Sequence, residues 1–125
     1  MIVGIGTDIV QVDRIARSIE RLGDAFARRI LTENEYQTWR DRSRSPAWLA
    51  KRFAAKEAVS KAFGTGIGKL SFQHIEVRNT SSGAPELVLY DYGLELKEAN
   101  GIASMHISLS DEKDNAIAFV VLEKA

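Results

Sequence analysis

Hydrophobic and polar residues along this chain follow two different periods, which together predict a mixture of strands and helices. The segment 2–10 follows period two, as a strand does. One side of this strand carries Val3, Ile5, Thr7 and Ile9. The other side carries Gly4, Gly6 and Asp8. Two further strand pairs are expected, at residues 72–79 with 86–90 and at residues 103–109 with 116–122.

Helical spacing of the apolar residues predicts five helices around these strands. They cover residues 13–22 with Asp13 as N-cap, 24–30, 32–42, 46–63 and 92–100. Thr32 followed by Glu35 is a capping-box pattern, and Pro46 stands at the favoured first position of the longest helix. This order favours an α+β fold in which a mainly antiparallel sheet is packed against the long helix. Because no linker or repeat divides the chain, we expect residues 1–125 to form a single domain.

Composition and charge narrow the classes of function. The chain is 45% hydrophobic and 27% charged, which is typical of a soluble globular domain. It has no cysteine, which excludes a disulfide framework and a thiolate metal site. No apolar run reaches membrane length and the N-terminus lacks a basic region, so we expect a cytoplasmic protein without a membrane partner. The formal net charge of zero argues against nucleic-acid binding.

Two carboxylates stand in apolar surroundings. Asp8 interrupts an apolar strand, and Glu57 shares a stripe of the long helix with Ala50, Ala54 and Lys61. Each acid is a candidate metal ligand or acid–base group, because a buried charge needs a partner. From spacing alone, a turn-capping or arginine-paired Asp8 and a simple Glu57–Lys61 surface pair are the more common explanations. The residues themselves leave both alternatives open.

Three further polar features are candidates for binding. His106 lies on a strand face with serines at both sides, although a lone histidine is most often structural. Arg14, Arg17 and Arg21 fall within about 60° on the first predicted helix, which suits either a solvated face or an acidic protein partner. The glycine loop 64–68 follows a helix instead of preceding one, so it lacks the geometry of a P-loop but leaves room for an anionic ligand.

Three segments together resemble the holo-acyl-carrier-protein synthase family. They are GIGTDIVQVDRI at the N-terminus, WLAKRFAAKEAVSKAFGTGIG in the long helix and its loop, and HISLSDEKDNAIAFVVLE near the C-terminus. The resemblance implies the 4′-phosphopantetheinyl transferase fold and a Mg²⁺-dependent enzyme of fatty acid biosynthesis. Such an enzyme moves phosphopantetheine from coenzyme A to a serine of apo-acyl carrier protein, giving holo-acyl carrier protein and adenosine 3′,5′-bisphosphate. Gln11 departs from the family pattern, in which an acid is frequent, but it lies outside the implied metal site.

The resemblance also implies roles for individual residues. Asp8 and Glu57 match the Mg²⁺ ligands, and Lys61 matches a lysine that contacts the pyrophosphate of coenzyme A; these three are the expected catalytic residues. His106 matches a histidine placed against coenzyme A phosphates from a neighbouring subunit of a homotrimer with sites at its interfaces. The proton of the attacking serine would pass to Glu57 or to a metal-bound water.

Two groups of residues are implied at the edges of this site. Those that border coenzyme A are Gly64, Gly66, Ser82, Gly83 and Pro85. Those that receive the acyl carrier protein are Arg14, Arg17 and Arg21. Two other functions fit the same residues: a different Mg²⁺-dependent enzyme acting on a nucleotide or pyrophosphate, and a non-catalytic module that binds coenzyme A or an acidic protein.

Overall fold

The chain folds into five helices, five strands and one short 3-10 helix, and the computed structural model describes all 125 residues. The elements in chain order are β1 (Ile2–Gln11), α1 (Val12–Leu22), α2 (Asp24–Ile30), α3 (Glu33–Asp41), α4 (Pro46–Phe63), η1 (Phe72–His74), β2 (Ile75–Asn79), β3 (Pro85–Leu89), α5 (Asp91–Ala99), β4 (Ile102–Asp111) and β5 (Asn115–Lys124). None of the helices combines the length and the apolar composition needed to cross a membrane.

The strands form two antiparallel sheets. The larger has the order β1-β5-β4, and the smaller is the β2–β3 hairpin. In the larger sheet Asp8 of β1 lies opposite Ala118 of β5, which in turn lies opposite Leu109 of β4. The predicted α+β class and antiparallel pairing are confirmed, with the strands divided between two sheets.

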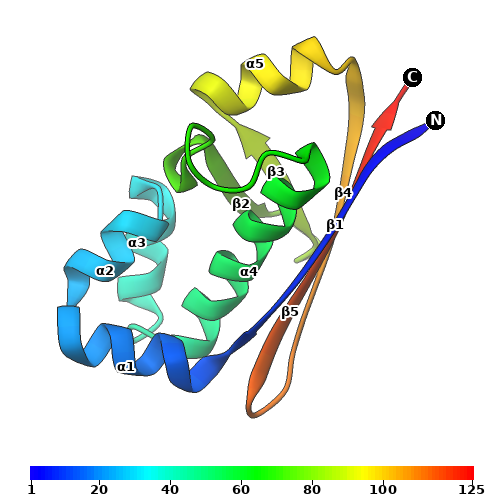
Figure 1. Cartoon of the computed structure of the whole chain (residues 1–125). Helices are drawn as coiled ribbons and strands as arrows, with labels where there is room; N and C mark the ends of the chain where they lie inside the picture. Colours follow the sequence, from blue (N-terminus) through cyan, green and yellow to red (C-terminus); the bar gives the residue numbers. More distant parts are fainter.

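Helix α4 lies between the larger sheet and the layer formed by α2 and α3 (Figure 1). The glycine side of β1 faces it. A Cβ atom added to Gly6 would lie 1.8 Å from the carbonyl oxygen of Ala58, and one added to Gly4 would lie 2.1 Å from that of Ala62. Backbone thus meets backbone, which only glycine allows at these two positions. This close approach brings the side chains of β1 within reach of those on α4.

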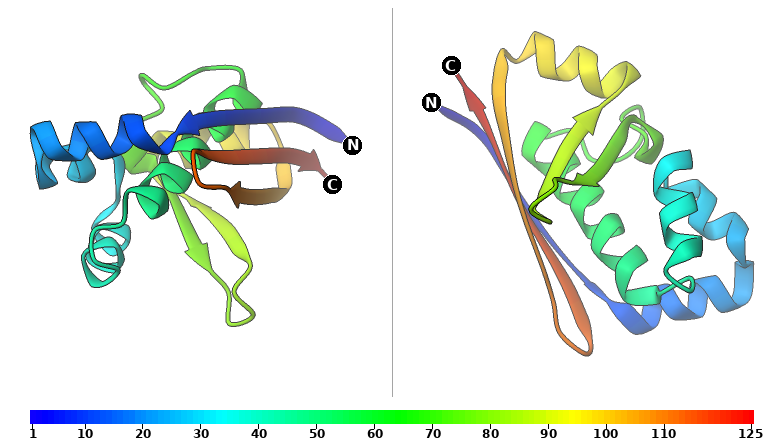
Figure 2. Two further views of the ribbon diagram at one scale, coloured as in Figure 1. Left: turned by 90° about the horizontal axis from the view of Figure 1, so that it is seen from below. Right: turned by 180° about the vertical axis from the view of Figure 1, so that it is seen from behind.

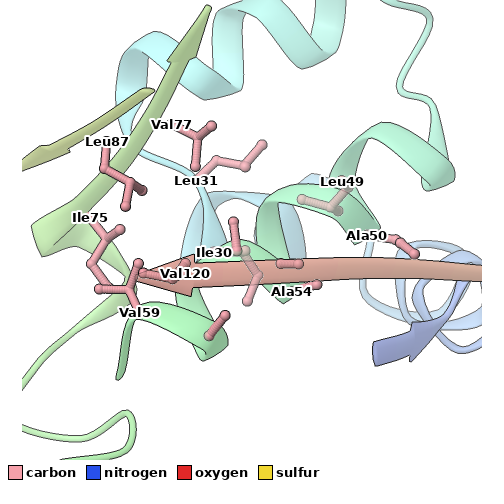
Figure 3. Packing of buried hydrophobic residues seen from close by; sticks show 14 of the residues in the cluster. Ile30, Leu31, Leu49, Ala50, Ala54, Val59, Ile75, Val77, Leu87 and Val120 are labelled. Atoms are coloured by element: carbon pink, nitrogen blue, oxygen red, sulfur yellow. The ribbon is translucent and has the colours of Figure 1, made fainter. Parts of the chain in front are cut away.

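The core gathers around α4 from several elements. Its largest contributions come from small residues of α4 and from the apolar sides of β2, β3 and β5; Figure 3 shows Ala50, Ala54, Val59, Ile75, Val77, Leu87 and Val120 packed together. Alanine at buried helix positions lets the sheet approach closely. The opposite, apolar side of β1 is exposed instead, with Ile5 58% and Ile9 61% accessible.

The helix ends agree with most of the sequence signals. Thr32 and Glu35 form the expected capping box, and the side chain of Ser45 accepts a hydrogen bond from the Trp48 amide at the start of α4. The prediction for Asp13 was wrong: Gln11 is the N-cap, and Asp13 lies within the first turn, where its charge favours the helix dipole. The predicted strand 72–79 begins with a 3-10 turn before β2.

Candidate active site

Asp8 is held at the junction of β1 and α4. Its carboxylate oxygen Oδ1 accepts a hydrogen bond from the Lys61 ammonium at 3.0 Å, and that ammonium also donates to the carbonyl oxygen of Thr7 at 3.1 Å. The Asp8 side chain is largely buried, whereas that of Lys61 is half exposed. Gly4 and Gly6 on the same side of β1 clear the space in which α4 presents this lysine.

Glu57 precedes Lys61 by one turn of α4 and belongs to the same cluster. Burial raises the pKa of its carboxyl group, the charge of Asp8 raises it further, and the charge of Lys61 lowers it. The two carboxylates therefore repel each other across the β1–α4 contact. The structure thus brings together the three expected catalytic residues, which are separated by up to 53 positions in the sequence.

This donor set fits a hard divalent cation. Mg²⁺ prefers oxygen ligands and typically takes one or two protein carboxylates, with water and substrate phosphates at the other positions. Asp8 and Glu57 provide two carboxylates whose mutual repulsion a cation would relieve. No set of three or more potential metal ligands occurs in the chain, so an all-protein cage is absent.

The glycine loop after α4 begins three residues beyond Lys61. Gly64 has a φ of 77° and Gly66 a φ of 68°, both in the left-handed region that favours glycine. The amides of Thr65 and Gly66 donate to the Ser60 carbonyl oxygen and so close the helix. A Cβ added at Gly64 or Gly66 would meet nothing within 4 Å. The space beside these two glycines is therefore open.

The arginines of α1 line one surface cleft. Arg14, Arg17 and Arg21 surround it together with Ser18, and all three are exposed. None of them forms an ion pair, although seven ion pairs occur elsewhere in the chain. Helix α1 continues directly from β1 (Figure 1), so this arginine surface begins close to Asp8 in the chain.

The remaining predicted residues lie across the sheet from this cluster. His106 is on the outward face of β4, where its Nε2 atom lies 2.9 Å from a carboxylate oxygen of Glu123. Strand β5 separates β4 from β1, because it pairs with both of them. Within one chain, His106 therefore does not join Asp8 and Glu57.

Ser82, Gly83 and Pro85 also lie on the β4 side of the sheet. The turn between β2 and β3 is closed by hydrogen bonds from the Thr80 amide to the Ala84 carbonyl oxygen and from the Gly83 amide to that of Thr80. Figure 2 shows this hairpin projecting past the β4 edge and away from β1. The predicted residues thus divide into two halves, one at β1 and α4 and one at β4 and the hairpin.

Sequence reasoning missed Arg52, which is only 5% exposed. Its guanidinium lies 4.1 Å from the centre of the Trp48 ring, and one Nη donates to Asn79 at 2.8 Å. Its Nε atom is buried without a hydrogen-bond partner. A cleft of about 420 Å³ beside it is lined also by Arg42 and Arg78. Glu35 and Glu76 also line this cleft, and Glu76 pairs with Arg78, which leaves the Arg52 N–H and Arg42 as its donors for an anion.

Lys56 is a second residue that sequence reasoning did not single out. It is fully buried, and its ammonium donates to the Glu35 carboxylate and to the carbonyl oxygens of Ile30 and Phe72. Burial lowers the pKa of this lysine, and Glu35 opposes that effect. The three bonds fix α4 to α2, α3 and η1, and so fix the helix that carries Glu57.

Known proteins match the chain over nearly its whole length. A family model described as the 4′-phosphopantetheinyl transferase superfamily (ACPS) matches residues 4–120. The holo-[acyl-carrier-protein] synthase of Shewanella oneidensis is 50% identical over 124 residues, 98% of this chain and 97% of that relative. The crystal structure of the synthase from Neisseria meningitidis has a TM-score of 0.93 and 46% identity, covering 99% of this chain and 100% of that one.

A further solved structure carries a ligand. It is a holo-(acyl-carrier-protein) synthase from Bacillus anthracis in complex with CoA (3′,5′-ADP), with a TM-score of 0.84, 44% identity and coverage of 100% of this chain and 99% of that one. Sequence and shape therefore agree, and the family resemblance of the three segments is confirmed. The chain belongs to the 4′-phosphopantetheinyl transferase superfamily, within its holo-[acyl-carrier-protein] synthase family.

Proposed function

We propose that this enzyme transfers 4′-phosphopantetheine from coenzyme A to a serine of apo-acyl carrier protein, with Mg²⁺, and so supplies holo-acyl carrier protein for fatty acid biosynthesis. The second product is adenosine 3′,5′-bisphosphate. The observation that carries the proposal is the meeting of Asp8, Glu57 and Lys61 at the β1–α4 contact. The relatives named holo-[acyl-carrier-protein] synthase, one of them in complex with coenzyme A, support it.

Asp8 and Glu57 are the residues that would hold Mg²⁺. When bound, the ion neutralises charge on the pyrophosphate and orients the leaving group. Lys61 places an ammonium beside Asp8 on the exposed side of the cluster, where it can bind a phosphate oxygen. The open glycine loop that follows lets the ligand approach the backbone without a side-chain clash.

The transfer exchanges a phosphoanhydride bond of coenzyme A for a phosphate ester bond to the carrier serine. The serine oxygen forms a bond to the pantetheine phosphorus, while the bond from that phosphorus to the bridging pyrophosphate oxygen breaks and the oxygen leaves with adenosine bisphosphate. Glu57 is the group of this chain that would accept the serine proton, because its carboxylate lies in the cluster and is the one there that Lys61 does not directly bind. The nucleophile belongs to the carrier, which agrees with the absence of an activated serine or cysteine beside the cluster.

The two halves of the site would meet between subunits. Because one half lies at β1 and α4 and the other at β4 and the hairpin, contact between two copies would join different surfaces, which generates a closed ring when the rotation fits. The exposed apolar outer face of the sheet, including Ile9 and Phe119, supports such an assembly. We take the ring to be a homotrimer, in which His106 of one subunit faces the metal site of the next.

Two arginine groups have matching roles in this proposal. Arg52, with its unpaired N–H and the nearby Arg42, would receive a phosphate group of coenzyme A. The uncompensated row Arg14, Arg17 and Arg21 would receive the acidic surface of the carrier protein and accelerate encounter. One group thus serves the small substrate and the other the protein substrate.

Mass spectrometry of the carrier tests the proposal directly. The protein is incubated with coenzyme A, Mg²⁺ and apo-acyl carrier protein, and the carrier is weighed before and after. We expect a mass increase of one phosphopantetheine group, and no increase when Mg²⁺ is chelated. Incubation of a carrier in which the acceptor serine is replaced by alanine is the control. An unchanged carrier mass at every enzyme concentration would overturn the proposal.

A further inference from the structure

Lys61 is the only cation that directly contacts the carboxylate pair. Its ammonium donates to Asp8 Oδ1 at 3.0 Å and to the Thr7 carbonyl oxygen at 3.1 Å, which anchors it to β1 rather than to its own helix. Glu57 receives no hydrogen bond from any side chain, so Lys61 also supplies the only charge that counters it. Lys61 therefore places one positive charge beside two acids.

The position of this ammonium conflicts with the metal role of Asp8. A cation with one or two protein carboxylates as ligands would bind the Asp8 carboxylate, whose Oδ1 atom Lys61 now contacts. Two positive charges beside the same carboxylate repel each other, and the repulsion is partly screened because Lys61 is half exposed. The ammonium must therefore weaken its bond to Asp8 when a divalent ion binds there.

We propose that Lys61 is a displaceable counter-ion of Asp8: it occupies the carboxylate while no metal is present, competes with the metal for it, and is drawn away by the phosphates of coenzyme A. This inference rests on the proposed function, since it uses both substrates of the same site. The side chain is half exposed and long enough to turn toward a ligand, and the bond that it gives up is an exposed one.

The competition couples metal binding to coenzyme A binding. A phosphate oxygen that accepts the Lys61 ammonium removes the competitor from Asp8, so coenzyme A raises the metal affinity by more than direct contact with the ion provides. By thermodynamic linkage, the metal raises the affinity for coenzyme A by the same factor. Lys61 would thus act as a positioning residue for the metal and as a phosphate ligand afterwards.

Mn²⁺ binding to the full-length protein, without carrier, tests the competition. Free Mn²⁺ is counted by its electron paramagnetic resonance signal, with and without coenzyme A. We expect Lys61→Met to bind Mn²⁺ about two- to five-fold more tightly than the wild type when coenzyme A is absent, because the exposed ion pair is lost. The increase in Mn²⁺ affinity produced by coenzyme A should shrink in the same variant.

Two variants separate competition from a general loss of charge. Lys51→Met removes a lysine of the same helix that pairs with Asp111, and it should leave Mn²⁺ affinity unchanged. In an Asp8→Asn background, Lys61→Met should give no gain. Equal or weaker Mn²⁺ binding by Lys61→Met alone, or a gain that persists without Asp8, would overturn the inference. The Mn²⁺ measurement needs no carrier protein. A failure of this inference can therefore be distinguished from a failure of the proposed phosphopantetheine transfer.

Discussion

Gly6 is the position at which a single methyl group should do most damage. In Gly6→Ala the new Cβ would lie 1.8 Å from the Ala58 carbonyl oxygen and 2.8 Å from the Ala62 amide nitrogen. An ordinary contact begins at 3.4 Å, so β1 and α4 must separate locally by about 1.6 Å. No rotamer change can relieve the clash, because both partners are backbone. Overpacking costs about 1–3 kcal/mol where side chains adjust, and we expect Gly6→Ala to lie at or above 3 kcal/mol.

The effect should reach the site as well as stability. Asp8 stands two residues after Gly6 on the same side of β1, and Glu57 directly precedes Ala58, so the separation moves the two acids apart. Urea unfolding followed by circular dichroism gives the free energy, and Mn²⁺ titration of the folded fraction gives the metal affinity. Gly68→Ala is the matched control, because a Cβ there meets nothing within 4 Å. A Gly6→Ala protein with the wild-type urea midpoint would refute the reasoning.

Three other predictions concern docking, the buried lysine and assembly. Arg17→Glu should raise the KM for the carrier protein about ten-fold with little change in that for coenzyme A, whereas Lys124→Glu at the far end of the sheet should change neither. Lys56→Met should lower the free energy of unfolding by about 3 kcal/mol, because it leaves Glu35 buried and unpaired, and the added change Glu35→Gln should restore part of it in urea titrations. Phe119→Glu should convert the proposed trimer to monomers in light scattering after size-exclusion chromatography, and a variant that stays trimeric would contradict the proposed interface.

The local elements were largely predictable, because their signals lie within a few residues. Thr32 with Glu35, and Ser45 with Pro46, use side chains three positions apart or adjacent, and both pairs cap the helices as expected. Asp13 shows the limit: an acid near a helix start suits either the cap or the first turn, and the choice depends on where the preceding strand ends.

The side of β1 that packs inward was not predictable from period two alone. Alternation identifies two sides but does not say which is buried, and an apolar side is ordinarily expected to face the core. Here the glycines face α4 and Ile5 and Ile9 are exposed. The reason lies outside the strand: α4 presents small residues such as Ala58 and Ala62, so the most intimate contact is made by residues without side chains.

The burial of the charged residues on α4 could not be predicted from residue type either. Lys56, Glu57 and Lys61 read alike as polar positions of one helix, yet Lys56 is fully buried and Lys61 is half exposed. The two lysines differ in their partners. Lys56 binds Glu35 and two carbonyl oxygens, whereas Lys61 binds Asp8. Those partners lie 21 and 53 positions away, so only the fold assigns them.

Glu57→Gln should expose the conflict between stability and function at this cluster. The pKa of Glu57 is higher in the folded chain than in the unfolded chain. At a pH above the raised pKa, Glu57 is ionised in both states and destabilises the fold to its full extent. At a pH below the ordinary pKa, Glu57 is protonated in both states and this destabilisation is absent. Glu57→Gln should then unfold at higher urea than the wild type at pH 8, and the difference should disappear toward pH 4. Phosphopantetheine transfer should fall by at least about 100-fold, because the glutamine cannot accept the serine proton. Added Mg²⁺ should stabilise the wild type and narrow the gap, since the proposed site for it, the Asp8–Glu57 pair, exists only in the folded chain. A variant that is less stable than the wild type at pH 8 would show that the folded structure does not disfavour the ionised form of Glu57.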